Sequence, residues 1–358
     1  MNETDIYYMN HALELARRGI GRVSPNPAVG AVLVSGATII GEGYHAQFGG
    51  DHAEVMAIKS GHGATSGATL YVTLEPCSIT GKTPPCTDAV IEAGVARVVI
   101  ATLDPNPHVK GNGAKKLRDA GIAVDIGVEA ARGARLIRGF SKWIVDKLPF
   151  VTLKIARTRD NFVLQSLENK KWFTSDQSRK RVHELRAEHD AVLVGSNTVE
   201  EDNPALTVRE IEGINPIRVV LDTDNRLTED HKVFSDLAAA TLRFSSQGTP
   251  GKQQWGEHFV VPRSDSGLSL AAVMDVLGKR GVTSVLIEGG PLLQRACFDG
   301  GYADEIAIFT SPHNAEAGVI QKGNLENTVL IPVDWEQIEY GATGLDNFQL
   351  AAKSKKGA

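Results

Sequence analysis

One stretch decides the fold of the first half of this chain. It begins Gly49-Gly50-Asp51-His52-Ala53-Glu54 and reaches Leu74-Glu75-Pro76-Cys77. Residues 53–59 (AEVMAIK) have the apolar spacing of a helix, which places His52 and Glu54 on its first turn. Residues 69–74 (TLYVTL) form an apolar run typical of a buried strand. The stretch therefore predicts a helix and a strand that each carry chemically active residues at one end.

The residue types at these ends predict a catalytic zinc site. His52, Cys77 and Cys86 are one imidazole and two thiols, and Cys86 lies just before a predicted helix at 87–94. Catalytic zinc sites usually have three protein ligands and leave one position for water. Glu54 then remains free to move protons, as in the His-x-Glu and Pro-Cys pattern of nucleobase deaminases.

Two other interpretations remain open. Cysteines inside intracellular proteins are more often inert core residues than metal ligands. A non-enzymatic zinc scaffold is the second alternative, and it requires four protein ligands with no open position. Helix N-termini favour thiolates, so the predicted places of Cys77 and Cys86 favour metal binding.

The motifs of the first domain resemble those of the bifunctional riboflavin-biosynthesis deaminase/reductase family. A Gly-Lys-Thr-Pro-Pro-Cys run separates this family from cytidine and tRNA-adenosine deaminases. The matching motifs, in chain order, are Pro25-Asn26-Pro27-Ala28-Val29-Gly30, Gly41-Glu42-Gly43-Tyr44-His45, His52-Ala53-Glu54, Tyr71-Val72-Thr73-Leu74-Glu75-Pro76-Cys77-Ser78, Gly81-Lys82-Thr83-Pro84-Pro85-Cys86 and Asp104-Pro105-Asn106-Pro107.

The resemblance implies an α/β fold in two parts: a cytidine-deaminase-like three-layer α/β/α domain followed by a dihydrofolate-reductase-like α/β domain. It also implies zinc-dependent hydrolytic deamination of 2,5-diamino-6-(5-phosphoribosylamino)pyrimidin-4(3H)-one. NADPH-dependent reduction of the ribosyl group to ribityl would follow. Zn²⁺ and NADPH are the expected cofactors, and a small phosphoribosyl pyrimidine is the expected substrate.

Length and composition agree with a two-domain enzyme. The chain has 358 residues, a formal charge of -5 and 3 cysteines. A domain usually has roughly 150 residues, so this length fits two domains. The absence of a basic, aromatic stretch argues against a nucleic-acid partner, because phosphate backbones need a positive surface. With no disulfide framework and no apolar targeting segment, we expect a cytoplasmic protein without a membrane partner. We also expect a homo-oligomer.

A change of pattern near residue 147 predicts the domain boundary. Short strands are expected at 28–34, 38–40, 95–101 and 122–126, and an amphipathic helix at 130–146. Lys147-Leu148-Pro149 ends that helix, and a new strand is expected at 150–156. We therefore expect a deaminase domain at 1–146 and a reductase domain at 147–358.

The resemblance also implies substrate contacts in the first domain, at Asn26, His45, Lys82 and Asn106. Asn26 lies between two prolines that restrict its backbone, and its amide suits a ribose or base edge. A loop-capping role is the alternative for Asn26. Taken alone, the other three would more often be surface polar groups.

In the second domain the resemblance assigns substrate contacts to Lys154, Asp202 and Glu288. It assigns the cofactor to Trp172, Thr174, Gly289 and Gly290. A Glu-Gly-Gly turn between a strand and a helix lets backbone N–H groups approach a phosphate, although a plain left-handed turn explains the glycines equally well.

The first domain departs from the family pattern at Ile79-Thr80, where a His often follows Cys-Ser. The second domain departs from it in three segments: Thr158-Arg159-Asp160-Asn161, Leu167-Glu168 and Ser311-Pro312-His313-Asn314. Leu167 lacks the hydrogen-bonding group of the usual Ser, and Glu168 would repel cofactor phosphates. We therefore expect reduction to survive with weaker cofactor binding. The alternative is a deaminase whose catalytically inactive reductase-like domain serves in dimerisation or substrate retention, and NADPH binding distinguishes the two.

Overall fold

A computed structural model of the chain describes residues 2–80, 84–163, 174–265, 267–314 and 331–354. The chain forms two compact units, Met1–Lys147 and Leu148–Ala358. None of the helices in the described part has the length and apolar character needed to cross a membrane.

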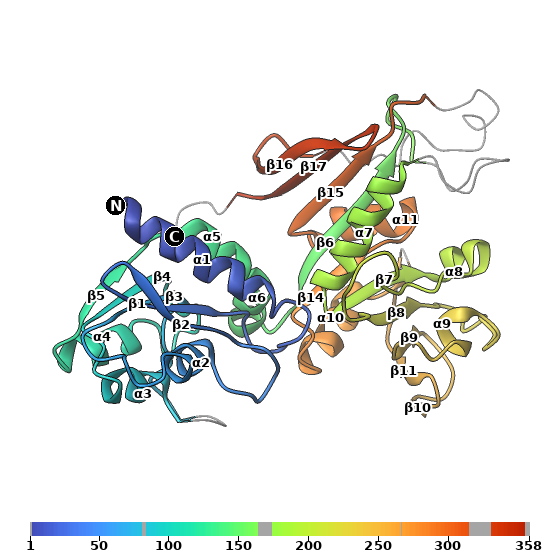
Figure 1. The fold of residues 1–358 in the computed structure, drawn as a ribbon. Helices are drawn as coiled ribbons and strands as arrows, with labels where there is room; N and C mark the ends of the chain where they lie inside the picture. Colours follow the sequence, from blue (N-terminus) through green and yellow to red (C-terminus); the bar gives the residue numbers. More distant parts are fainter. Residues whose placement is uncertain (1, 81–83, 164–173, 266, 315–330, 355–358) are drawn as a thin grey trace. The chain divides into compact units, whose positions relative to one another are not determined.

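The first unit is a five-stranded sheet with helices on both faces, in the order β2-β1-β3-β4-β5 (Figure 1). β1 pairs antiparallel with both β2 and β3, whereas β3, β4 and β5 run parallel. Its elements are α1 (Glu3–Arg17), β1 (Gly30–Ser35), β2 (Thr38–Tyr44), α2 (Ala53–Ser60), β3 (Thr69–Leu74), α3 (Cys86–Glu92), β4 (Arg97–Thr102), α4 (Asn112–Asp119), β5 (Ala123–Ile126), α5 (Ala130–Leu136) and α6 (Arg138–Asp146).

Alternation along the central strands builds the two cores of this unit. Leu70 and Val72 of β3 pack in a cluster that includes Ala57 of α2. Tyr71, between them, packs on the opposite face with Met9 of α1. Side chains of a strand point alternately to its two faces, so one strand supplies both cores. The predicted helix at 53–59 and strand at 69–74 are confirmed as α2 and β3.

The predicted single helix at 130–146 was wrong, because the structure has two helices that meet at Ile137. The backbone of Ile137 has φ -102° and ψ 19°. Leu136 packs against the cluster on the α1 face, whereas Ile137 is buried in the cluster on the other face. The break lets adjacent residues serve different cores.

The second unit is a ten-stranded sheet in the order β10-β11-β9-β8-β7-β14-β6-β15-β17-β16, accompanied by a two-stranded sheet of β12 and β13. Its strands are β6 (Phe150–Arg157), β7 (Ala191–Gly195), β8 (Ile217–Leu221), β9 (Thr241–Ser245), β10 (Gly251–Gln253), β11 (Gly256–Val260), β12 (Arg263–Ser264), β13 (Gly267–Leu268), β14 (Ser284–Ile287), β15 (Glu305–Thr310), β16 (Trp335–Thr343) and β17 (Asp346–Lys353). Its helices are α7 (Asp176–Glu188), α8 (Ser196–Asp202), α9 (Lys232–Ser235), α10 (Leu270–Lys279) and α11 (Pro291–Asp299).

The middle of this sheet is parallel, with β6 between β14 and β15. Leu153 and Ile155 of β6 pack in the large core that includes Val273 of α10. The alternation of the strand therefore turns Lys154 toward the opposite face. Leu185 of α7 packs on that face, so α7 covers the side of the sheet to which Lys154 points.

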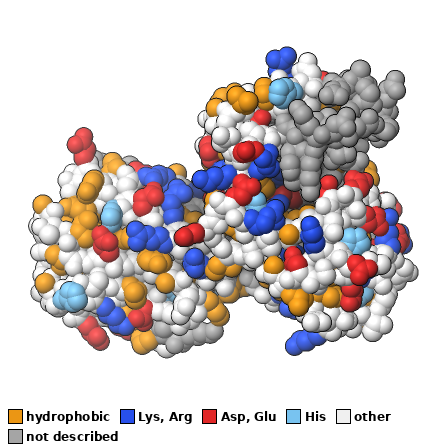
Figure 2. All heavy atoms as spheres, turned by 45° about the vertical axis from the view of Figure 1, so that its right-hand side comes forward, with side chains coloured by type: hydrophobic (Ala, Val, Ile, Leu, Met, Phe, Trp, Pro, Cys, Tyr) orange, Lys and Arg blue, Asp and Glu red, His pale blue; other side chains and the backbone are white. Residues whose placement is uncertain are grey.

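On the face drawn in Figure 2, Lys and Arg side chains of the described residues are interspersed with Asp and Glu side chains. Within each unit taken by itself, the described residues on that face form no continuous basic stripe of the kind that follows a phosphate backbone.

Candidate metal centre and ligand pocket

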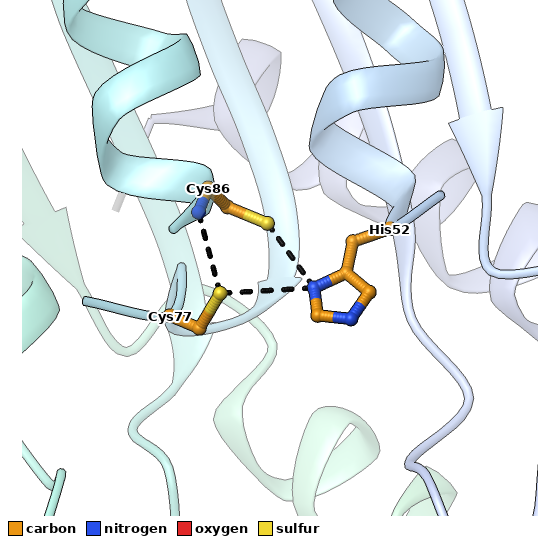
Figure 3. Close-up of side chains that lie close together, drawn as sticks. All are labelled: His52, Cys77 and Cys86. Atoms are coloured by element: carbon orange, nitrogen blue, oxygen red, sulfur yellow. Dashed lines mark hydrogen bonds between the residues drawn. The ribbon is translucent and has the colours of Figure 1, made fainter. Parts of the chain in front are cut away.

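His52, Cys77 and Cys86 meet at one point in the first unit, although they come from three different elements (Figure 3). His52 is the N-cap residue of α2, Cys77 follows β3, and Cys86 is the first residue of α3. One ligand atom from each lies within 4.8 Å of the other two. Among the described residues this is the one group of at least three His, Cys, Asp or Glu side chains that could hold a metal ion.

The spacing of the three ligand atoms fits tetrahedral zinc. His52 Nδ1 lies 3.2 Å from Cys86 Sγ and 3.7 Å from Cys77 Sγ. Zinc bonds of about 2.3 Å to sulfur and about 2.1 Å to nitrogen place such atoms about 3.6 Å apart around a tetrahedral ion. The two nitrogen–sulfur distances are therefore within about 0.4 Å of those around a tetrahedral zinc ion.

The charges in this group also suit a cation. The hydrogen bond with Cys86 lowers the pKa of Cys77 to about 4, despite the opposing effect of burial. The same contact raises the pKa of Cys86, so in the protein alone the two thiols share one proton. The backbone N–H of Cys86 donates to Cys77 Sγ at 3.3 Å, which further favours a thiolate there. A divalent ion would displace the shared proton, since metal ligands bind as thiolates.

Glu54 lies beside this group without belonging to it. Its side chain is buried on the first turn of α2. In the protein alone, burial and then the negative charge of Cys77 raise its pKa to about 7. A carboxyl group in such surroundings is suited to take up a proton and to release it.

His45 and Asn26 form a hydrogen-bonded pair next to His52. His45 Nδ1 lies 3.0 Å from the Asp51 carbonyl, which only accepts, so Nδ1 is the donor. His45 Nε2 then accepts from Asn26 Nδ2 at 3.1 Å. The His45 and His52 rings meet edge to face, with centroids 5.2 Å apart. Burial lowers the pKa of His45, which favours the neutral ring.

Asn106 lies on the loop that follows β4. Its amide oxygen accepts from the backbone N–H of His108 at 3.1 Å, and its own N–H donates to Asp104 Oδ1 at 2.8 Å. Lys82, the fourth residue that the resemblance assigns to this substrate, lies outside the described residues.

A cavity of about 430 Å³ lies in the second unit. Six of the residues predicted for this domain line it: Lys154, Thr174, Asp202, Glu288, Gly289 and Gly290. Trp172 lies outside the described residues, as do Leu167 and Glu168. Two of the segments that depart from the family pattern contact each other. The Arg159 backbone N–H donates to the His313 carbonyl at 2.9 Å, and Arg159 Nε donates to Asn314 Oδ1 at 3.2 Å.

The sequence analysis missed the basic residues of this cavity. Arg179, His183 and Arg186 of α7 line it, together with Arg209. Their spacing along α7 places them on one face of the helix. That spacing was the available signal, but it did not reveal which face of the helix would meet a cavity.

Charges inside the cavity are paired unevenly. Arg186 donates to Glu288 from Nε at 2.5 Å and from Nη2 at 3.0 Å, and to the Thr207 carbonyl at 3.1 Å. Burial raises the pKa of Glu288, but Arg186 outweighs it and the net shift is downward. Burial lowers the pKa of Lys154, with Glu288 opposing. Within this cavity Arg186 and Glu288 thus form a compensated ion pair, and Lys154 is a desolvated amino group.

Two family models match the chain. The model of the cytidine and deoxycytidylate deaminase zinc-binding region matches residues 2–102, and that of the RibD C-terminal domain matches residues 149–340. The riboflavin biosynthesis protein RibD of Aquifex aeolicus is 41% identical over 87% of this chain and 88% of its own length. That of Escherichia coli is 39% identical over 86% and 88%.

Solved structures agree over nearly the whole length. The diaminohydroxyphosphoribosylaminopyrimidine deaminase/5-amino-6-(5-phosphoribosylamino)uracil reductase of Thermotoga maritima has a TM-score of 0.84 and 36% identity, covering 98% of this chain and 99% of that one. RibD of Acinetobacter baumannii has a TM-score of 0.82 and 31% identity, covering 99% of each. The predicted fold class is confirmed: a cytidine-deaminase-like domain precedes a dihydrofolate-reductase-like domain.

Proposed function

This chain belongs to the RibD family, the bifunctional deaminase/reductases of riboflavin biosynthesis, and on that premise we propose which residues perform each reaction. It carries a zinc-binding deaminase domain and a reductase domain of the NADPH-dependent type. We assign deamination to the first unit and reduction to the second. No finding favours the alternative of an inactive reductase-like domain.

In the first unit, His52, Cys77 and Cys86 would hold the zinc ion, and the 3.2 and 3.7 Å ligand spacings support this most directly. When bound, zinc supplies Lewis-acid activation of water near neutral pH. The substrate is 2,5-diamino-6-(5-phosphoribosylamino)pyrimidin-4(3H)-one, as the name of the Thermotoga relative suggests.

Glu54 moves the protons of this reaction. It takes a proton from the attacking water as the new C–O bond forms at the amine-bearing ring carbon. It delivers that proton to the neighbouring ring nitrogen. It then takes the second proton from the resulting C–OH group and passes it to the departing amine, as the C=O bond forms, the C–N bond breaks and ammonia leaves. Its burial beside the three ligands, outside their shell, supports this role.

Asn26 and His45 orient the substrate at this site, together with Lys82 and Asn106. Because both ring nitrogens of His45 are engaged with protein groups, we infer that His45 acts by holding Asn26 and by packing against His52. A phosphate contact through a charged imidazole is a poorer fit to this geometry.

In the second unit, NADPH supplies a hydride when bound. Reduction adds that hydride to C1′ of the ring-opened ribosyl group and one proton to the adjacent nitrogen, which gives the ribityl amine. Lys154 and Asp202 would hold the opened sugar, and Glu288 would hold Arg186 in place beside it. Thr174, Trp172 and the Gly289-Gly290 turn would contact the cofactor. The shared cavity supports this arrangement for the described residues.

Location and assembly are also proposed. None of the 3 cysteines forms a disulfide, and Cys77 and Cys86 must stay reduced to bind metal, which supports a cytoplasmic protein. A homo-oligomer is supported by β16, which lies at the edge of the sheet formed by the described residues, because an edge strand can pair with a strand of a second copy. Cell fractionation and concentration-dependent light scattering test these two points.

One assay tests the activities together. Purified protein is supplied with the deaminase substrate, and ammonia and NADPH absorbance are followed in the presence and absence of NADPH. We expect ammonia in both cases and NADPH oxidation only after deamination. Ammonia without NADPH oxidation, combined with no NADPH binding on titration, would contradict the reductase assignment.

A further inference from the structure

Glu75 is a buried carboxylate at the end of β3, two residues before Cys77. It is 4% exposed. Its Oε2 accepts from the backbone N–H groups of Asp104 at 3.1 Å and Gly111 at 2.9 Å. Its Oε1 accepts from that of Ala114 at 3.0 Å. All three donors belong to the segment between β4 and the first turn of α4.

Helix α4 needs a partner of this kind. The first N–H groups of a helix have no acceptor within the helix, and the N-cap residue Gly111 has no side chain to supply one. Glu75 supplies the missing acceptor from another strand. Its negative charge also lies at the positive end of the helix dipole.

The same end of α4 touches the turn that carries Cys77. A Cβ atom on Gly113 would lie 2.0 Å from the carbonyl oxygen of Pro76, so any larger residue would push the helix and the turn apart. Glu75 therefore fastens the turn to α4 by hydrogen bonds at the place where Gly113 allows direct contact.

The hydrogen bonds of Glu75 continue through Asp104 to Asn106. Glu75 fixes the Asp104 backbone, Asp104 Oδ1 accepts from the Asn106 N–H at 2.8 Å, and Asn106 Oδ1 accepts from the His108 N–H at 3.1 Å. Because Asn106 uses its amide oxygen inside the loop, its Nδ2 group is the end that offers hydrogens to a ligand.

We propose that Glu75 is a positioning residue of the deaminase, joining the turn that carries Cys77 to the loop that carries Asn106. This deepens the proposed function, because it rests on Asn106 contacting the deaminase substrate. Glu75 acts through these two residues and does not touch the reacting atoms.

The test compares Glu75→Gln with the wild type. The Gln side chain has the same size, but its Nε2 group would face N–H donors, so at least one contact is lost. We expect KM for deamination to rise at least about tenfold with kcat changed less than about threefold, the effect of one lost charge-assisted contact. We also expect a chelator to remove zinc at least about tenfold faster, while NADPH-dependent reduction by the second unit is unchanged.

Asn2→Ala is the matched control, because Asn2 caps α1 of the same unit by accepting from the Thr4 N–H at 3.1 Å. It should lower the melting temperature without changing KM or zinc release. The double variant Glu75→Gln/Asn106→Ala should have a KM close to that of Asn106→Ala alone, since the two residues act in series.

The proposal is overturned if Glu75→Gln lowers the melting temperature but leaves KM and zinc release within about twofold of wild type, the size of an uncoupled change. It is also overturned if Asn2→Ala raises KM equally. If Glu75→Gln does not fold, Glu75→Asp, which keeps the charge with a shorter reach, is measured in the same way. Should the wild type release no ammonia, the proposed function fails, whereas the zinc-release comparison still tests Glu75.

Discussion

Arg186 and Glu288 form a bidentate ion pair inside the cavity of the second unit, with N–O distances of 2.5 and 3.0 Å. Their side chains are 11% and 7% exposed. A buried charge pair of this geometry contributes little net stability, but loss of one partner leaves the other charge uncompensated. Glu288 therefore governs whether Arg186 is held at the substrate site.

We predict that Glu288→Ala destabilises the second unit by about 3–5 kcal/mol and lowers reductase activity, because Arg186 keeps a buried, unpaired charge. Urea unfolding and NADPH oxidation measure the two effects. Asp275→Ala, which breaks the exposed pair with Lys279, is the control and should change stability by less than about 1 kcal/mol. Equal effects of the two variants would show that the buried pair has no special role.

Glu54→Gln should retain zinc and fold but lose deamination by about a hundredfold or more, the usual contribution of a general acid–base group. Cys86→Ala should instead lose the metal as well, because it removes one of the three ligands. Metal analysis and ammonia release separate the two outcomes. Near-normal ammonia release by Glu54→Gln would refute the proton-transfer role.

Lys154→Ala should reduce the kcat/KM for reduction by about tenfold to a hundredfold, the cost of one charge-assisted contact. Burial lowers the pKa of Lys154, so the amino group is kept in the cavity at a desolvation cost, which a contact with the substrate would offset. Ammonia release should not change, since Lys154 belongs to the other unit. Unaltered NADPH oxidation would remove Lys154 from the site.

The Asp5 carboxylate should make the stability of the first unit depend on acid pH. It accepts two hydrogen bonds from Arg97, at 2.8 and 2.9 Å, and one from the Tyr71 hydroxyl at 2.8 Å. The Arg97 contact lowers the pKa of Asp5 below its ordinary 3.8. A carboxyl group whose pKa is lower in the folded state stabilises the folded protein at any pH above its unfolded-state pKa. This stabilisation is lost as the pH falls through the folded-state pKa.

Asp5→Asn should therefore cost roughly 1.5–3 kcal/mol at neutral pH. The difference from wild type should shrink below about pH 3.8, as both chains lose the charge-assisted contacts. Urea unfolding at pH 7 and near pH 3 measures this. Asp125→Asn serves as the control, because Asp125 also pairs with Arg97 but its side chain is 55% exposed. This variant should lose less than about 1 kcal/mol of unfolding free energy. A pH-independent deficit in Asp5→Asn would contradict the charge-based explanation.

Local pattern was sufficient for the elements that carry the metal ligands. The spacing of residues 53–59 and the apolar run of residues 69–74 specify α2 and β3, because periodicity depends on neighbours in the chain. A helix start and a strand end also have definite chemical properties, so His52, Glu54 and Cys77 could be chosen by residue type. The break at Ile137 could not be predicted, since it depends on which core each neighbour enters.

The sequence by itself pointed to the family and the two-part α/β fold, through the resemblance of its motifs. It also predicted the proposed zinc ligands, through residue types and their order along the chain. Only the tertiary structure decided that Arg186 pairs with Glu288, which is 102 residues away. It also decided that Glu75 accepts a hydrogen bond from Gly111, the N-cap residue of α4, which is 36 residues away. Charged and polar residues of this kind have many possible partners along a chain. Packing selects one of them, because a buried charge or N–H group must find its partner where the folded backbone places it.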